Sequence, residues 1–196
     1  MATRRVAGAV LAAGAGVRMG RPKAELEIDG QRLVDRAVGV LRAGGCDPVI
    51  AVVRTGAQVP GAVTVTNDDP QRGMRSSLEL AVGAAGDVDA LAVLLVDAPG
   101  VGADAVRWTV RAWRSGRIAI ATFGGIRGHP IVMAPDLWRE AAQRAEPDEG
   151  ARAYIADNAE LVDLVPVPGD PSDVDTPADL ARWGPAGAKR PPHRYD

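Results

Sequence analysis

The chain has 196 residues, a formal net charge of −2 at pH 7 and 24 % charged residues, which is typical of one ordinary domain. Its 46 % of hydrophobic residues can supply a core without a disulfide or a structural metal. The single cysteine, Cys46, excludes an intramolecular disulfide and every Cys-rich zinc or iron–sulfur site, and it fits a reducing compartment. The near-neutral charge balance argues against a nucleic-acid partner.

The start of the chain has some features of a secretory signal. Arg4 and Arg5 precede an apolar run over 6–14, but this run is short, contains glycines and leads directly into Arg18 and Lys23. A buried strand that ends in a functional loop explains the pattern better. No later segment has the roughly 18 apolar residues that cross a bilayer. We therefore expect a cytoplasmic protein with no membrane partner.

Apolar runs alternate with helical patterns along the chain. The first half predicts a small turn at 26–30, helices at 31–42 and 74–85, and strands at 6–11, 48–53, 63–66 and 90–96. The last of these runs is apolar throughout, which is typical of a central parallel strand that is buried on both faces.

The second half continues the alternation. It predicts helices at 104–114, 135–144, 151–156 and 177–183, strands at 118–123, 129–133 and 161–167, and a glycine-marked loop at 124–128. Trp108, Trp113 and Trp138 fall at helical positions, and we assign all three to the core. Residues 184–196 lack apolar periodicity, so we expect one domain over 1–183 and a disordered tail.

This order of elements predicts an α/β fold of three layers, in which helices cover both faces of a mostly parallel sheet. Ligands of such sheets bind beyond the carboxyl ends of the strands. The loops after Leu11, Val96 and Val167 are therefore the expected places for a functional site.

The loop after the first strand is rich in glycine and carries two cations. It lacks both the glycine spacing of a dinucleotide fingerprint and the Gly-Lys-Ser/Thr of a Walker loop. Its small residues would let the backbone approach a nucleotide closely, while Arg18 and Lys23 could bind the phosphates. The alternative is a glycine-rich turn with solvated basic side chains.

The string over 11–23, Leu-Ala-Ala-Gly-Ala-Gly-Val-Arg-Met-Gly-Arg-Pro-Lys, resembles the signature of the MobA-related nucleotidyltransferases, and among them it is most similar to the molybdenum cofactor cytidylyltransferases. Further blocks agree in order over roughly residues 5–183, namely Asn67-Asp68, 73–78, Asp97-Ala98-Pro99, Gly128-His129-Pro130, Gly150-Ala151-Arg152 and 173–180. The resemblance implies a nucleotide-diphospho-sugar transferase-like Rossmannoid fold. It also implies a nucleotide site built from Leu11, Ala12, Ala13, Gly14, Gly16, Arg18, Lys23, Asn67, Ser76 and Ser77. From the residues alone, the two serines could equally be ordinary helix caps.

Two acids suit a magnesium ion. Asp97 ends an apolar strand, where a carboxylate loses hydration unless it faces water or a cation, and Asp175 lies in the turn before the last helix. The resemblance assigns both to Mg²⁺, although Asp175 could instead cap the helix that begins at Pro177. After Asp97 the family usually has Met-Pro-Leu, whereas this chain has Ala-Pro-Gly, which leaves the metal acid intact but leaves the exact pterin substrate open.

His129 is a lone histidine, a type that is usually hydrogen-bonded for structural reasons. The resemblance places His129 near the acceptor substrate, so we predict that it binds the acceptor.

These observations lead to one main functional hypothesis. The chain would transfer CMP from CTP to the phosphate of molybdopterin, with Arg18, Lys23, Asp97 and Asp175 as catalytic residues and a molybdenum hydroxylase as recipient of the product. The alternatives are transfer from another NTP or to a sugar-phosphate, isoprenoid or phospholactate-type acceptor, and a non-catalytic protein that delivers the cofactor.

Overall fold

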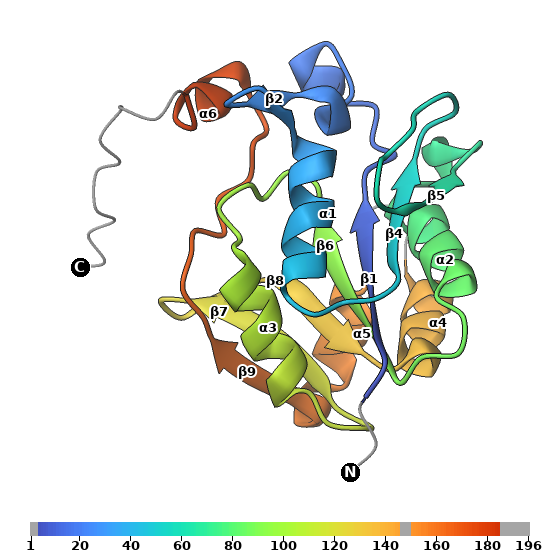
Figure 1. Ribbon diagram of the computed structural model, residues 1–196. Helices are drawn as coiled ribbons and strands as arrows, with labels where there is room; N and C mark the ends of the chain where they lie inside the picture. The colour runs from blue at the N-terminus through green and yellow to red at the C-terminus, as the bar shows by residue number, and fades with distance from the viewer. Residues whose placement is uncertain (1–3, 146–149, 185–196) are drawn as a thin grey trace.

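The computed structural model describes residues 4–145 and 150–184 and has a seven-stranded sheet at its centre (Figure 1). The strand order is β5-β4-β1-β6-β8-β7-β9. The strands are β1 (Val6–Leu11), β4 (Val49–Val53), β5 (Val63–Thr66), β6 (Ala90–Leu95), β7 (Ile118–Phe123), β8 (Ile126–Met133) and β9 (Val162–Pro166). Strand β8 runs antiparallel to β6 and β7, and all other neighbours are parallel. The predicted three-layer, mostly parallel α/β fold is confirmed.

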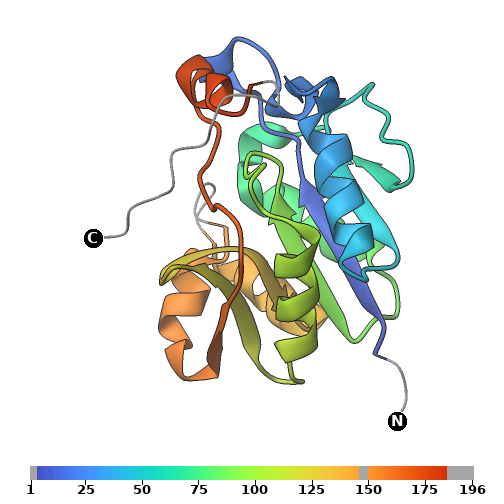
Figure 2. The same cartoon turned by 60° about the vertical axis from the view of Figure 1, so that its left-hand side comes forward.

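Helices cover both faces of this sheet (Figures 1 and 2). Helices α1 (Leu33–Ala43) and α3 (Ala103–Ala112) pack on one face, and α2 (Met74–Ala84), α4 (Pro135–Arg144) and α5 (Arg152–Asp157) pack on the other. A short helix α6 (Pro177–Ala181) lies beside the small hairpin of β2 (Glu27–Ile28) and β3 (Gln31–Arg32). Single 3₁₀ turns occur at η1 (Val17–Met19), η2 (Lys23–Glu25), η3 (Pro70–Arg72) and η4 (Ala159–Leu161).

Most of the core residues are alanine and valine, which permit close packing. Gly8 in β1 is also closely packed, because a Cβ there would lie 3.0 Å from Cys46 and 3.1 Å from Leu41 of α1. Trp138 and Trp113 are both 2 % exposed, as predicted. Trp108 is 47 % exposed, so its assignment to the core is wrong. It projects from the face of α3 opposite to the residues that meet the sheet.

Some predicted boundaries are also wrong. Residues 31–32 belong to β3 and not to the first helix, because they pair with β2 across a turn at Asp29 and Gly30, which both have positive φ. The loop predicted at 124–128 is reduced to Gly124 and Gly125, whose positive φ angles turn the chain directly into β8. Most of the predicted tail, residues 185–196, lies outside the described part.

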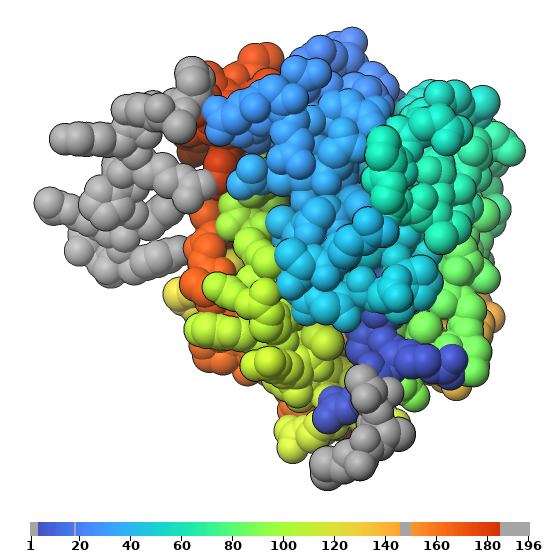
Figure 3. Space-filling model, in the orientation of Figure 1, coloured from blue at the N-terminus to red at the C-terminus, as the bar shows by residue number. Residues whose placement is uncertain are grey.

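The carboxyl ends of β1, β4 and β6 meet at one edge of the sheet, the upper edge in Figure 1. In the space-filling view, the segment after β9 lies beside α3 and reaches the β2–β3 hairpin (Figure 3). This segment brings residues 170–176 to the edge where the loop after β1 also lies. Within residues 4–145 and 150–184, no helix combines the length and the apolar character that a membrane span requires.

Candidate active site

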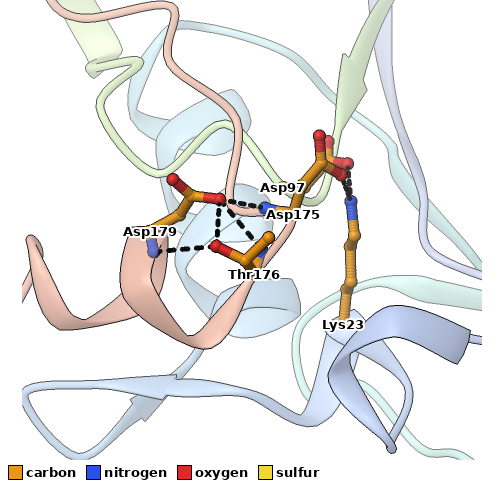
Figure 4. Close-up of polar contacts among 5 residues, drawn as sticks. All are labelled: Lys23, Asp97, Asp175, Thr176 and Asp179. Carbon is orange, nitrogen blue, oxygen red and sulfur yellow. Dashed lines mark hydrogen bonds and ion pairs between the residues drawn. The ribbon is translucent and has the colours of Figure 1, made fainter.

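Three charged residues from distant parts of the chain meet at the carboxyl edge of the sheet (Figure 4). Lys23 Nζ donates to Asp97 Oδ2 and to Asp175 Oδ1, and both distances are 2.6 Å. Lys23 begins η2 after the glycine loop, Asp97 follows β6, and Asp175 precedes α6. The structure thus brings together three of the four residues that the sequence proposed as catalytic.

The loops that carry the two acids are tied to each other by main-chain contacts. Val174 N donates to the carbonyl oxygen of Asp97 at 2.8 Å, and Asp170 N donates to that of Gly100 at 3.1 Å. A Cβ at Gly100 would overlap the ring of Trp183 and would lie 2.5 Å from the carbonyl oxygen of Asp170. The C-terminal segment therefore packs directly on the backbone of Gly100, where a side chain would not fit.

Asp175 is not the cap of the last helix. Thr176 is the N-cap, since its hydroxyl accepts from Asp179 N at 3.2 Å while the Asp179 carboxylate accepts from Thr176 N at 2.9 Å. This reciprocal capping box leaves the Asp175 carboxylate to contact Lys23. The alternative assignment of Asp175 as a helix cap is wrong.

The charges of this cluster perturb one another. Burial alone would lower the pKa of Lys23, but its hydrogen bonds to Asp175 and Asp97 outweigh that effect and raise it. A third carboxylate, Asp173, lies beside the pair and was missed as a site residue. Desolvation, followed by the negative charges of Asp97 and Asp175, raises the pKa of Asp173 to about 6. The Asp-x-Asp spacing was the signal that could have identified it.

The acid pair has the donor set that a hard divalent cation prefers. Oδ1 of Asp97 is buried and has no hydrogen-bond partner in the described part of the chain, so one carboxylate oxygen is still free for a cation. No group of three His, Cys, Asp or Glu side chains in residues 4–145 and 150–184 is arranged around a metal position. Two carboxylates suit Mg²⁺, which commonly binds through one or two of them together with substrate phosphates and water.

A pocket of about 400 Å³ and another of about 330 Å³ adjoin this cluster and share part of their walls. The smaller one, here called the loop pocket, is lined by the glycine loop, Lys23 and Asp97 on one side and by Gly73, Met74 and Ser77 on the other. Leu11, Ala13, Gly14 and Gly16 are on its wall, whereas Ala12 lies on the opposite side of the loop. Gly16 has φ 62°, and a Cβ there would overlap the carbonyl oxygen of Arg21, so the turn requires glycine. The side chain of Arg18 lies outside the described part.

The predicted nucleotide residues Asn67, Ser76 and Ser77 form one buried network. Asn67 Nδ2 donates to Ser76 Oγ at 2.9 Å and to Ser77 Oγ at 3.0 Å, and Ser76 Oγ donates to the carbonyl oxygen of Gly73 at 3.0 Å. Only Ser77 lines the loop pocket. Asn67 and Ser76 are not among the residues that line this pocket, and Asn67 holds the Ser77 hydroxyl by its hydrogen bond. That these three residues bind a nucleotide stays a prediction.

The larger pocket, here called the second pocket, has apolar walls and basic residues at its mouth. Arg127, His129, Arg152 and Asp173 line it. The side chain of neither arginine has a hydrogen bond or ion pair with the described residues. His129 Nδ1 lies 3.1 Å from the carbonyl oxygen of Val93, and burial lowers the pKa of the imidazole. The neutral ring then carries its proton on Nδ1, which leaves Nε2 as a hydrogen-bond acceptor.

A sheet covered by helices on both faces, with a glycine-rich loop and two lysine-bridged carboxylates at the carboxyl ends of its strands, is typical of nucleotide-binding α/β proteins. Residues 8–162 match the MobA-like NTP transferase domain, and the chain belongs to this family of nucleotidyltransferases.

Three comparisons with known proteins agree with this assignment. The nicotine blue oxidoreductase of Paenarthrobacter nicotinovorans is 35 % identical over 194 residues, which cover 90 % of this chain and 95 % of that protein. A probable molybdenum cofactor guanylyltransferase of Opitutus terrae is 39 % identical over 121 residues, 59 % of each chain. The crystal structure of an Rv0371c homologue from Mycobacterium sp. strain JC1 superposes with a TM-score of 0.79 at 28 % identity, and covers 91 % of this chain and 96 % of its own.

Proposed function

We propose that this nucleotidyltransferase transfers CMP from CTP to the terminal phosphate of molybdopterin and releases pyrophosphate. The observation that carries the proposal is the position of Lys23, which binds Asp97 and Asp175 beside a loop pocket and an adjoining second pocket. The loop pocket would hold the nucleotide, and the second pocket would hold the acceptor.

The reaction requires positioning and charge neutralisation more than a covalent nucleophile. An oxygen of the acceptor phosphate attacks the α-phosphorus of CTP, and the bond from that phosphorus to the bridging oxygen of the β-phosphate breaks. Pyrophosphate leaves with the electron pair of that bond. Lys23 would stabilise the charge that develops on the leaving group, and Arg18 is assigned a similar role by the family motif.

Asp97 and Asp175 would hold Mg²⁺, which when bound neutralises triphosphate charge. The free, buried Oδ1 of Asp97 supports this assignment. The choice of CTP rests on the Leu11-Ala12-Ala13 motif, and because one relative carries a guanylyltransferase name, GTP is the competitor to test.

The second pocket suits a flat, anionic acceptor. Its walls include Trp138 and Ile120. The guanidinium groups of Arg127 and Arg152, which have no partner among the described residues, can bind a phosphate. Nε2 of the neutral His129 can accept a hydrogen bond from a heterocyclic N–H. Molybdopterin has this chemistry, and a cytoplasmic molybdenum hydroxylase would be the recipient of the product.

The test is a matrix of CTP, GTP and ATP against molybdopterin with Mg²⁺, in which pyrophosphate release and the mass of the product are measured. We expect turnover with CTP and little with ATP. Preferential turnover with GTP would move the protein to the guanylyl branch. If no nucleotide and acceptor pair releases pyrophosphate, the transferase proposal fails.

A second candidate function follows from the relative that covers most of the chain, which is named an oxidoreductase. One of the two pockets would then hold nicotine blue or a related organic compound, and the other an electron donor or acceptor. A change in the absorbance of nicotine blue in the presence of a redox partner, without pyrophosphate release from any NTP, would favour this candidate. The variant Lys23→Ala separates the two, because it should impair nucleotidyl transfer more than electron transfer.

A further inference from the structure

Lys23 lies where the two site carboxylates can share a cation. Its ammonium nitrogen is 2.6 Å from an oxygen of each, and the Lys23 and Asp97 side chains are both only 20 % exposed (Figure 4). The ammonium therefore neutralises, at short range, the same two groups that fit a divalent metal ion.

A metal ion and the ammonium cannot both hold these two oxygens closely. Mg²⁺ binds carboxylate oxygens at about 2.0–2.1 Å, which is shorter than the 2.6 Å that each oxygen keeps from Nζ. A second cation on the same pair would stand within a few ångströms of Nζ in a partly buried site, where like charges repel strongly. The free Oδ1 of Asp97 does not remove the conflict, because a cation bound to it would still lie close to the ammonium that contacts Oδ2 of the same carboxylate.

We propose that Lys23 and a divalent cation compete for Asp97 and Asp175, and that a bound triphosphate relieves the competition by giving Lys23 a new anionic partner. The second half of this inference rests on the proposed function, whereas the competition itself does not. Lys23 thereby makes the metal bind well only together with the nucleotide. The two ligands are coupled through one side chain that changes partner.

The residue type at this position supports an exchange of partners. The whole chain contains only two lysines, Lys23 and Lys189, among 23 basic Lys and Arg residues. An arginine would bind carboxylates through a planar, bidentate fork, whereas an ammonium is a compact charge on a flexible stem. Lysine can therefore release one anion and reach another without a shift of the main chain. A permanent structural ion pair would be served equally well by the arginine that this chain uses elsewhere.

The first test measures Mn²⁺ binding without nucleotide, from the electron paramagnetic resonance signal of the free ion. We expect Lys23→Met to bind Mn²⁺ about tenfold or more tightly than the unaltered protein, because the competing cation is gone. Lys23→Arg should bind it no more tightly than the unaltered protein. Arg21→Met is the matched control, since Arg21 is a nearby cation with no hydrogen bond or ion pair to the described residues, and its affinity should stay within about twofold.

Equal or weaker Mn²⁺ binding by Lys23→Met would overturn the competition. A non-hydrolysable CTP analogue should increase the Mn²⁺ affinity of the unaltered protein by a larger factor than it increases that of Lys23→Met. If Lys23→Met binds Mn²⁺ more tightly as expected, but the analogue does not change the Mn²⁺ affinity of either protein, the competition stands and the proposed nucleotide function fails.

A second readout keeps Lys23 itself unaltered. Lysine labelled at Cε gives two NMR signals, and Lys189→Arg identifies the one from Lys23. This signal should shift when the CTP analogue and Mg²⁺ are added together. It should change little when Mg²⁺ alone is added at the same concentration. A Lys23 signal that stays in place when the analogue binds would refute the exchange of partners.

Discussion

The two neighbouring serines of α2 allow structural and functional roles to be separated. Ser76 and Ser77 are 4 % and 6 % exposed, and both accept a hydrogen bond from Asn67. The hydroxyl hydrogen of Ser76 is directed at main-chain carbonyl oxygens, that of Gly73 at 3.0 Å and that of Asp69 at 3.3 Å. Because Ser77 Oγ accepts from Asn67 and lines the loop pocket, its hydrogen can be donated to a ligand.

The expected effects of alanine at the two positions differ accordingly. Ser76→Ala removes the hydrogen bond from Asn67 and the hydroxyl's contacts with the carbonyl oxygens of Gly73 and Asp69, which should cost about 1–3 kcal/mol of stability. For a protein of this size each kcal/mol lowers Tm by about 2–4 °C. Ser77→Ala removes one bond from Asn67 and one donor from the pocket. A neutral hydrogen bond to the ligand is worth about 0.5–1.5 kcal/mol, or roughly 2- to 13-fold in Kd.

Thermal unfolding and calorimetric titration with CTP and Mg²⁺ measure these two quantities on the same samples. Ser76→Ala should have the lower Tm of the two variants and an unchanged Kd, whereas Ser77→Ala should bind CTP more weakly. If Ser76→Ala weakens CTP binding as much as Ser77→Ala does, the hydroxyl of Ser77 has no separate role. An unchanged Kd in Ser77→Ala would show that the ligand does not contact this hydroxyl.

Three further predictions concern other charged and buried groups. Asp97→Asn and Asp175→Asn should each abolish the Mg²⁺ dependence of NTP binding in calorimetric titrations, and an Asp175→Asn protein that keeps it would remove Asp175 from the metal site. Between its unfolded pKa of 3.8 and its folded pKa of about 6, Asp173 binds its proton more tightly in the folded state, so its contribution makes stability rise as the pH falls through this window. Asp173→Asn should remove that rise and increase Tm at pH 8, and an equal change in Tm at every pH would contradict the assignment. Burial raises the pKa of Cys46 to about 12, and the residue is 1 % exposed, so a thiol reagent should modify it only at the rate of unfolding; rapid modification of the native protein would show that α1 opens locally.

Local patterns in the sequence determined much of the fold. The strands at 63–66 and 118–123 and the helix at 135–144 were predicted with the bounds that the structure shows. Their periodicity depends on neighbours two to four residues apart, which the sequence displays directly. The glycine loop with Lys23 and the acid Asp97 were recognisable for the same reason, since each follows a buried strand closely in the chain.

The tertiary structure alone decided which of these residues meet and what each contacts. Lys23 is 152 residues from Asp175 in sequence, and the 2.6 Å contact between them exists because the segment after β9 returns across the sheet edge. The inward turn of Asn67 and Ser76, the antiparallel direction of β8 and the raised pKa of Asp173 likewise depend on packing between distant segments. Such contacts depend on how the layers of the fold pack against each other. A local sequence pattern does not encode them, because a motif with the same backbone conformation can face either a pocket or a neighbouring side chain.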